Sequence, residues 1–409
     1  MRYSGSDRLF HTQDMNPSSD SRYVDVAYTN GYEFTQGLGY SLPQYPFIAP
    51  TELLDKRVGK HPVVIVGGGI SGLTLACGLA KLGVPAVLLD EDNTVGVKGA
   101  SSRGICYTQK SLEIFQRYGI FDRIARKGVE WSVGRTFAGH DEVFSFDLKA
   151  QSSFNLSQQP AFINIQQFYI EGYLVERIAE LGRDRPGVEL RWSSRVTAFE
   201  QQGPSALLTI QTPQGSYQIE AEHVIDATGS HTPFHAWLGA ELEGKRGDDR
   251  WCIADVKFKT TPPTERHTWI EAPFNENRAV WQHLMGDEVW RIDYQMPPTR
   301  TPFRSVVRTW CGSVCNANLA MTCSATLCGW GPTLIAASVC ARCASGGCFS
   351  WVIRPKWSVL LGRAGATRAL PMQTIWHGNW PPWCAGGHLK ACCTLTMTKG
   401  WKPPSAMFK

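Results

Sequence analysis

A glycine-rich turn between an apolar strand and a helix is the feature that most constrains the fold of this chain. Residues His61 to Gly67 (HPVVIVG) form a short β-branched run, which is typical of a parallel strand buried on both faces. Ile70 to Leu82 has helical periodicity, and Pro85 to Asp90 (PAVLLD) is a second apolar run. Strand, turn, helix and strand within about thirty residues predict one βαβ unit.

The turn, GGGISG from Gly67 to Gly72, fits the pattern G-x-G-x-x-G. Gly67 permits the tight turn, Gly69 lets the backbone approach a pyrophosphate, and Gly72 lets helix and strand pack closely. The phosphates would lie at the positive N-terminus of the helix. Asp90 ends the second strand, where a carboxylate can accept hydrogen bonds from the ribose hydroxyls of an adenosine. The segment therefore predicts a dinucleotide site rather than a glycine turn without a nucleotide.

Further elements are expected along the chain up to residue 300. The pattern indicates two amphipathic helices, Gln109–Tyr118 and Gln167–Leu181. It also indicates three β-like runs separated by Gly/Pro turns: Val188–Glu200, Ala206–Gln211 and Tyr217–Ile225. Trp251 to Met296 alternates apolar and polar residues, which predicts an antiparallel sheet with one covered face, suited to the floor of a substrate domain. The expected fold class is α/β, a Rossmann-like nucleotide-binding domain with an antiparallel-sheet substrate domain.

Two further positions complete a pattern known from one family. Arg103 lies in SSRGICY, 13 residues after Asp90, and Gln167 lies in INIQQFYIEGYLVER before the long helix. Taken alone, Arg103 would be a solvated loop charge and Gln167 a helix cap. With the glycine turn, however, the chain resembles the FAD-dependent aromatic hydroxylases of the para-hydroxybenzoate hydroxylase type, over about residues 45 to 300. The phenol and 3-(3-hydroxyphenyl)propionate hydroxylase branch is the most similar. The resemblance implies FAD contacts for Gly67, Gly69, Gly72, Asp90, Arg103, Gln167 and Gly229.

The chain departs from two other motifs of that family. One is an Asp-Gly pair after a buried strand, with an arginine six residues after the glycine. The segment HVIDATGSHTPFHAWLG keeps Gly229 but has Thr228 in the Asp position and His235 in the Arg position, while Asp226 comes two residues too early. The third motif, Gly-Asp followed by Pro and a Gly-rich turn that opens a helix, has no match after residue 229. Both departures put FAD contacts in question, and the first also NADPH contacts, although Ala-Thr-Gly after a strand occurs in other flavoproteins.

The resemblance implies a monooxygenase in which NADPH or NADH reduces FAD, and a flavin C4a-hydroperoxide then transfers one oxygen atom from O2 to a phenolic ring. The cofactor supplies that chemistry, while the protein orients the reactants and excludes water. Tyr169, His283, Asp293 and Tyr294 are residue types that can assist deprotonation of a phenol, but a structural role is expected for each. No catalytic residue is assigned, and no metal is required. Two alternatives stay open: a non-catalytic truncated or frame-shifted product, and a flavoprotein reductase that inserts no oxygen.

The last 109 residues differ in composition from the rest. All 36 Asp and Glu residues precede residue 301, whereas the tail holds 11 of the 41 Lys and Arg, ten of the 13 Cys and eight of the 15 Trp. Residues 1–300 therefore carry 30 basic and 36 acidic groups, net −6, and the tail carries net +11. An ordinary segment of this length would have roughly ten to twelve acids. Only Cys77, Cys106 and Cys252 come earlier, which fits a reducing cytoplasm.

A change of reading frame would explain this tail. Grouping the third base of each codon with the next two permits LGDSAKVVSPFG from Ser350–Leu361 and DADNLAWKL from Pro371–Trp380. With the segment between them, these strings restore the missing third motif in the right order. The shifted frame meets no forced stop from about Arg304 to Lys409. We therefore hypothesise that translation leaves the parental frame near Pro302–Arg304, and that the tail has no native fold.

Three other interpretations of the tail are weaker. Cys340-x2-Cys343 suggests a zinc module, but the cysteine spacings do not form two matched C-x2-C pairs. Thr309–Ala341 carries no charge and could suggest a membrane span, but it contains Asn316, Pro332 and many Ser, Thr and Gly residues. A basic nucleic-acid-binding tail would need clustered Lys and Arg, and here they are scattered.

These observations divide the chain into four parts: a leader (1–55), an FAD-binding domain (56–240) with a β insert near 188–220, a substrate-domain sheet (241–302) and an aberrant Cys/Trp-rich tail (303–409). The leader lacks the apolar core of a secretory signal, so a cytoplasmic protein is expected. The expected partners are a small aromatic substrate and O2, with neither nucleic acid nor membrane. A homodimer stays open.

Overall fold

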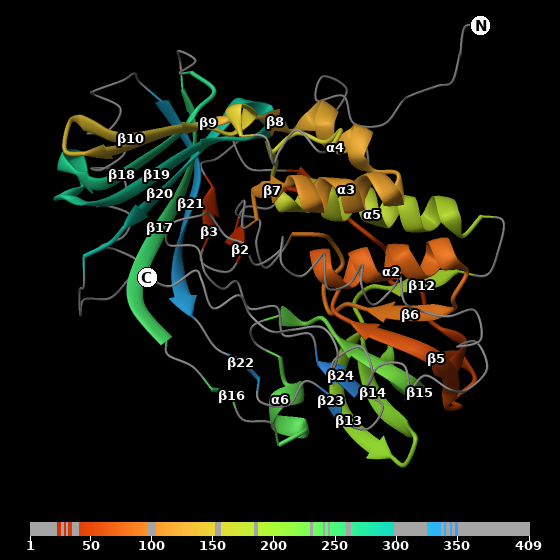
Figure 1. Cartoon of the computed structure of the whole chain (residues 1–409). Helices are drawn as coiled ribbons and strands as arrows, with labels where there is room; N and C mark the ends of the chain where they lie inside the picture. The colour runs from red at the N-terminus through yellow and green to blue at the C-terminus, as the bar shows by residue number, and fades with distance from the viewer. Residues whose placement is uncertain are drawn as a thin grey trace, which may run out of the picture.

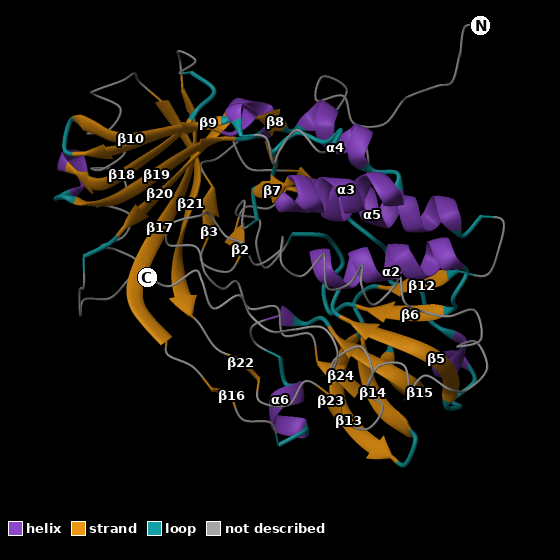
Figure 2. Cartoon of the chain, viewed as in Figure 1, coloured by secondary structure: helices purple, strands orange, loops and turns teal. Residues whose placement is uncertain are grey.

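Two large sheets dominate the described part of the chain, and helices cover one of them (Figures 1 and 2). The structure is a computed structural model. It describes residues 41–96, 104–151, 157–183, 187–229, 232–239, 242–243, 246–258 and 263–297, and the strands at 23–25, 28–29, 32–34, 325–336, 339–340, 344–345 and 348–350. The predictions for leader residues 1–22 and for most of 303–409 lie outside the described residues.

The first sheet has the order β12-β6-β5-β15-β14-β13. Its strands are β5 (Gly59–Val66), β6 (Ala86–Leu89), β12 (Val188–Arg191), β13 (Arg195–Gln202), β14 (Ser205–Thr212) and β15 (Gly215–Asp226). β12, β6, β5 and β15 run parallel, with Val66 opposite Leu89 on one side and Asp226 on the other. β24 (Cys348–Ser350) also pairs in parallel with β15, and Ser350 lies opposite Asp226. The predicted βαβ unit is confirmed.

Three helices begin and end where the periodicity predicts: α2 (Ile70–Leu82), α3 (Gln109–Tyr118) and α5 (Gln167–Leu181). α2 packs against α5 and β6. Val63 and Ile65 of β5 join the core beneath these helices, while Val64 and Val66 join the core formed with the antiparallel strands. Burial on both faces explains why β5 is apolar without alternation.

The run Val188–Glu200, predicted as one strand, is two strands, and this prediction is wrong. β12 pairs in parallel with β6, whereas β13 pairs antiparallel with β14. The chain turns between them at Ser193, whose φ of 51° lies in the left-handed region. The N–H groups of Ser193 and Ser194 donate to the carbonyl oxygens of Asp92 and Asp90 at 2.9 and 2.7 Å. These bonds hold the backbone of the turn, so the chain can leave β12 and enter β13 at two serines, without Gly or Pro.

The second sheet has the order β10-β9-β18-β19-β20-β17-β21-β3-β2. Its strands are β2 (Tyr28–Thr29), β3 (Tyr32–Phe34), β9 (Val133–Ala138), β10 (Asp141–Asp147), β17 (Arg246–Phe258), β18 (Arg266–Ala272), β19 (Arg278–Leu284), β20 (Val289–Gln295) and β21 (Ala325–Ala336). Strands β17 to β20 pair antiparallel, as predicted. The parallel pairing of β18 with β9 was not predicted.

The prediction that this sheet has one covered face is wrong for its central strands. Every residue of β20 from Val289 to Tyr294 is buried, including Arg291 and Asp293. Met285 and Val289 pack with Cys106 and Trp131, which belong to or adjoin a small sheet of β7 (Cys106–Thr108), β8 (Val129–Glu130) and β11 (Phe162–Asn164). The polar residues of the alternating pattern in β20, Arg291 and Asp293, therefore face the protein interior instead of water.

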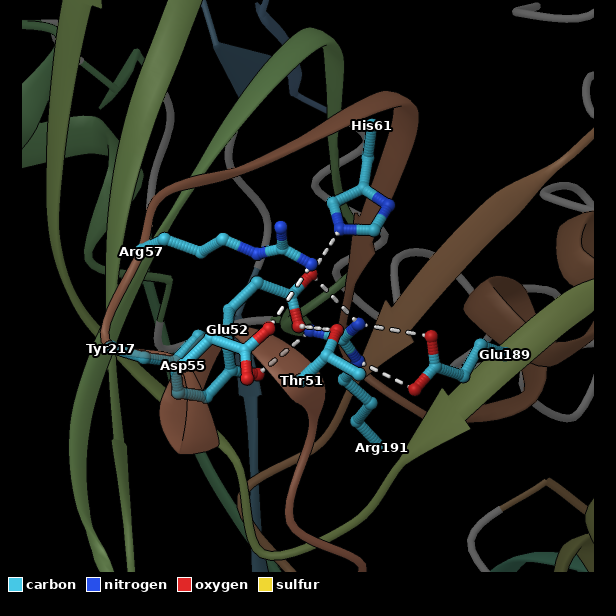
Figure 3. A network of polar contacts seen from close by, with 8 residues as sticks. All are labelled: Thr51, Glu52, Asp55, Arg57, His61, Glu189, Arg191 and Tyr217. Atoms are coloured by element: carbon cyan, nitrogen blue, oxygen red, sulfur yellow. Dashed lines mark hydrogen bonds and ion pairs between the residues drawn. The ribbon is translucent and has the colours of Figure 1, made fainter.

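A buried ion-pair network anchors the chain segment that precedes the glycine turn (Figure 3). Glu52, in the short helix α1 (Thr51–Leu54), accepts from Arg191 Nη2 at 3.2 Å and lies 2.7 Å from His61 Nε2. Arg191 also donates to Tyr217 Oη at 3.2 Å. Because Glu52 and Arg191 are both buried, each provides the counter-charge that the other needs. The end of the segment assigned to the leader is thus fixed to β12, β5 and β15.

A polar contact at the tip of the β19–β20 hairpin joins the two parts of the chain. Lys127, at the end of α4 (Phe121–Lys127), forms an ion pair with Asp287, and Asp287 Oδ2 accepts from Tyr169 Oη at 2.5 Å. Lys127 Nζ also lies 4.5 Å from the centre of the Tyr169 ring. Burial and the neighbouring Asp287 raise the pKa of Tyr169, so its hydroxyl stays protonated and donates.

We expect Asp287→Asn to lower the free energy of unfolding by about 1.5 kcal/mol, because Lys127 loses its charged partner while Tyr169 keeps an acceptor. Asn tolerates the left-handed backbone at this position, where φ is 65°, so the variant tests the charge alone. Asp55→Asn is the control, since the Asp55–Arg57 pair is exposed and should contribute about 0.5 kcal/mol or less. Urea unfolding measures both, and equal losses would show that the hairpin tip does not depend on this ion pair.

Within the described part of the chain, no helix combines the length and apolarity needed to cross a membrane. In the uncharged stretch Thr309–Ala341, the residues from Ala325 to Ala336 form β21 and extend the second sheet.

Candidate functional site

The glycine turn between β5 and α2 cannot accept side chains at two of its positions. Gly67 has a φ of +111°, and a Cβ there would lie 2.5 Å from the carbonyl oxygen of Ala227. A Cβ on Gly72 would lie 1.9 Å from the carbonyl oxygen of Gly67. Gly69 precedes α2 and has open space around it, with Glu171 Oε1 3.9 Å from an added Cβ. Gly72 is therefore required for close packing of helix and strand, as predicted, and Gly67 for the turn.

Asp90 lies beside this turn, where the sequence predicts it. Asp90 Oδ2 accepts from the backbone N–H of Gly68 at 2.5 Å, and Oδ1 accepts from the N–H of Asp92 at 2.9 Å. The carboxylate therefore fixes the glycine turn as well as standing at the end of β6. Burial and the charge of Asp90 raise the pKa of Asp92 to about 6.

Gln167 connects the loop after residue 103 with the interior of the site. Its Nε2 donates to Glu171 Oε1 at 2.7 Å, and its Oε1 lies so close to Gly104 that a Cβ there would approach to 2.7 Å. Gln167 is thus directed toward the loop that carries Arg103, although Arg103 itself lies outside the described residues. The FAD contacts of both residues stay predictions.

Glu171 is a member of this site that the sequence analysis missed. It is 3% exposed and accepts from Gln167 as well as from the backbone N–H groups of Ile70 and Gly96. It therefore ties α5 to the N-terminus of α2 and to the loop after β6. Burial raises the pKa of Glu171 to about 7. The available signal was its spacing, because residue i+4 from Gln167 lies on the same helix face.

The raised pKa of Glu171 makes the stability of the fold depend on pH. The folded state holds the proton more tightly than the unfolded state, whose pKa is the ordinary 4.5, so stability falls as pH rises from about 4.5 to about 7. We expect this carboxyl to account for a loss of about 3 kcal/mol across that window. Glu171→Gln should remove it, so the variant and the parent should diverge in melting temperature as pH rises from 5 to 8. Parallel pH profiles would show that Glu171 ionises as it does in water.

The strand end at β15 provides a second part of the site. Asp226 is fully buried; its Oδ1 accepts from the N–H and Oγ1 of Thr228 at 3.0 and 2.6 Å, and its Oδ2 from Thr232 Oγ1 at 2.5 Å. Asp226 therefore shapes the turn after β15, because both of its carboxylate oxygens bond threonines of that turn. Gly229 has a φ of +85° with no atom within 4 Å of an added Cβ, so glycine is needed there for its backbone and not for space. Its role toward FAD, and that of His235, stay predictions.

The four residues considered for activating a phenol lie in different places. Tyr169 is occupied by Asp287, which agrees with the structural role expected for it. In the register of β19 and β20, His283 lies opposite Arg291, and Asp293 lies opposite Trp281. Because residues two apart in a strand share a face, His283 and Asp293 face the same side of the second sheet. Tyr294 belongs to the opposite face. Of the four residues, the structure thus places only His283 and Asp293 on one face of this sheet.

The parallel sheet, the glycine turn and the carboxylate of Asp90 beside it define a Rossmann-like dinucleotide-binding fold. The chain belongs to the family described as FAD binding domain, which matches residues 60–311.

Relatives of known activity match the same part of the chain. It is 24% identical over 238 residues to a para-nitrophenol 4-monooxygenase of Pseudomonas sp. (strain WBC-3), covering 57% of this chain and 55% of that protein. It is 26% identical over 241 residues to a 3-(3-hydroxy-phenyl)propionate/3-hydroxycinnamic acid hydroxylase of Burkholderia vietnamiensis, covering 56% and 42%. The chain thus spans about half the length of these relatives.

Solved structures agree on the fold. The p-nitrophenol 4-monooxygenase of Pseudomonas putida has a TM-score of 0.64 at 18% identity, covering 78% of this chain and 79% of that one. An aklavinone-11 hydroxylase in complex with FAD and aklavinone has a TM-score of 0.67 at 15% identity, covering 80% and 63%. At these identities the likeness concerns the fold alone.

Proposed function

We propose that this protein is an FAD-dependent monooxygenase that hydroxylates a phenolic or other aromatic substrate, using NADPH or NADH and O2. The observation that carries the proposal is the glycine turn, where Gly72 cannot hold a Cβ and Asp90 binds the backbone of Gly68, in a chain of the FAD binding domain family. The relatives named above are aromatic hydroxylases, which supports the choice of reaction.

The residues of the chain suit the binding of FAD. The N-terminus of α2 and the turn from Gly67 to Gly72 would receive the pyrophosphate, and Asp90 the ribose of the adenosine. Gln167, Arg103 and Gly229 would contact the remainder of the cofactor. When bound and reduced, FAD supplies the transfer of an oxygen atom from O2 to the ring, while the protein positions the ring and excludes water.

Flavin content and coupled turnover test the proposal. With its tail restored to the ancestral frame, the purified chain should carry FAD, oxidise NADPH or NADH faster when a phenol is added, and form the hydroxylated phenol, whereas the chain as it stands should do so only weakly. Flavin reduction that yields hydrogen peroxide without a hydroxylated product would indicate a reductase. A colourless chain that binds no flavin even after the frame of its tail is restored would contradict the proposal.

We further propose that the tail impairs this activity because it leaves the frame of its ancestor. Two observations support this. The family match ends at residue 311, close to the inferred frame change near Pro302–Arg304. In addition, β24 ends at Ser350, level with Val66 and Asp226 at the carboxyl ends of parallel strands, where α/β proteins bind their ligands. The shifted frame permits Leu-Gly-Asp, the start of the missing motif, directly after this strand, whereas the printed frame continues with Trp351.

A further inference from the structure

Glu171 places a buried carboxyl group beside the turn that would receive the pyrophosphate. Its side chain projects from α5, is 3% exposed and accepts from Gln167 Nε2 at 2.7 Å. The backbone N–H groups of Ile70 and Gly96 complete its hydrogen bonds. No Lys, Arg or His of the described part of the chain forms an ion pair with it. A buried carboxylate without a counter-charge is costly, which favours a proton on this group.

The open space at Gly69 is bordered by this carboxyl group. Apart from the chain neighbours of Gly69, the one atom within 4 Å of an added Cβ would be Glu171 Oε1, at 3.9 Å. Gly69 is the position at which the motif lets a pyrophosphate approach the backbone. Ile70, whose N–H donates to Glu171, follows directly and is the first residue of α2. The carboxyl group and the expected pyrophosphate therefore share the N-terminus of one helix.

The titratable neighbours of Glu171 do not supply a positive charge. Asp90 adds a negative charge that disfavours ionisation of Glu171. Tyr107 in β7 is neutral, because burial and the nearby Glu171 raise the pKa of its hydroxyl. Asp92, beside Asp90, is a further carboxyl group, whose pKa burial and Asp90 raise to about 6. Arg103 belongs to the adjoining loop and lies outside the described residues. Each described neighbour is thus negative or neutral.

Two negative charges in one poorly hydrated site are costly to keep together. The pyrophosphate of a dinucleotide is a diester that stays ionised near neutral pH, so the charge that can be removed is that of Glu171. Burial raises the pKa of Glu171 to about 7, and about half of the free chains therefore hold this proton at pH 7. A pyrophosphate at the same helix N-terminus would raise this pKa further, which favours the protonated carboxyl group.

We propose that Glu171 takes up a proton when a dinucleotide pyrophosphate binds at the N-terminus of α2, so that the protein binds its cofactor together with a proton. The inference rests on the proposed FAD site and adds a pH dependence to it. One O–H bond forms on the carboxyl group of Glu171, the proton comes from the solvent, and nothing is oxidised or reduced. Glu171 is a positioning residue in this scheme, because it holds the backbone of the site and touches no reacting atom.

ADP-ribose is the probe, because it contains only the adenosine, pyrophosphate and ribose that the described site would hold and has no group that titrates near neutral pH. Calorimetry on the full-length chain at pH 7.5 in HEPES and in Tris measures the proton uptake, since the two buffers lose a proton with different enthalpies. We expect uptake of about 0.5 to 0.8 proton per bound ligand. The affinity should fall about five- to tenfold from pH 6 to pH 8, because the protonated fraction of the free chain falls from about nine tenths to about one tenth.

Glu171→Gln resembles the protonated carboxyl group in shape and keeps an acceptor oxygen. This variant should bind ADP-ribose without proton uptake and with equal affinity at pH 6 and pH 8, and at pH 8 about five- to tenfold more tightly than the parent. Asp92→Asn is the matched control. Asp92 is the neighbouring carboxyl group with a raised pKa, and its backbone N–H, which donates to Asp90, is unchanged by the substitution. The control should keep the proton uptake of the parent.

The outcomes separate this inference from the proposed function. A parent that binds ADP-ribose with the same heat in both buffers, or with equal affinity at pH 6 and pH 8, would overturn the inference and leave the FAD site in place. Loss of proton uptake in Asp92→Asn but not in Glu171→Gln would also overturn it, because the proton would then belong to the pair of Asp90 and Asp92. A parent and a Glu171→Gln variant that both bind no ADP-ribose at either pH would contradict the dinucleotide site that both proposals require.

Discussion

Gly72→Ala should abolish FAD binding and lower the free energy of unfolding by about 3 kcal/mol or more. The added Cβ would lie 1.9 Å from the carbonyl oxygen of Gly67 and 3.3 Å from the Cβ of Ala227, and neither atom belongs to a flexible side chain that could move away. The methyl group must therefore push α2 off β5. That movement displaces the helix N-terminus, which is the part of the site that would receive the pyrophosphate.

Gly172→Ala is the matched control, because the chain offers a second helical glycine with the opposite surroundings. Gly172 lies within α5, and no atom comes within 4 Å of an added Cβ. In this position Ala should raise the free energy of unfolding by about 0.5–1 kcal/mol through its better helix propensity. Guanidinium unfolding and flavin fluorescence on both variants test the pair. A Gly72→Ala variant as stable as the parent would show that α2 and β5 are less closely packed than described.

The elements that can be predicted from the sequence are those whose local hydrophobic pattern matches the way they pack in the folded protein. α2, α3 and α5 have the predicted bounds because each buries one face on the same core and ends at a glycine. The turn at Ser193 was missed because its signal is two serines, held by carbonyl oxygens of Asp90 and Asp92 that are distant in sequence. No periodicity can show such a contact.

The candidate site divides in the same way. Gly67, Gly72 and Asp90 are predictable, since the motif fixes both their types and their spacing. Glu171 is not, because a glutamate in a helix usually faces water. Its burial depends on the packing of α5 against α2, which only the tertiary structure provides. The alternation in β20 was misjudged for the same reason, because its polar positions face another part of the protein.

Restoring the frame of the tail should convert a chain with little bound flavin into one that retains FAD through gel filtration. Inserting one nucleotide near codons 302–304 groups the bases as the shifted frame requires, and the codons after β24 then permit Leu-Gly-Asp followed by a Gly-rich turn. This motif would emerge beside Gly67 and Ala227, because β24, β15 and β5 end level at one edge of the sheet. There it would complete a site of which the printed chain holds only the adenosine side.

The control for the repaired chain is the same insertion followed by a one-nucleotide deletion a few codons later, which returns the printed tail while keeping the altered junction. Only the repaired chain should gain flavin and phenol-stimulated NADPH oxidation. Equal flavin content in both would show that the printed tail does not limit cofactor binding, and the frame hypothesis would fail. If the repaired chain also holds no flavin, the assignment to FAD-dependent hydroxylation fails with it, because every element that the proposed site requires would then be present.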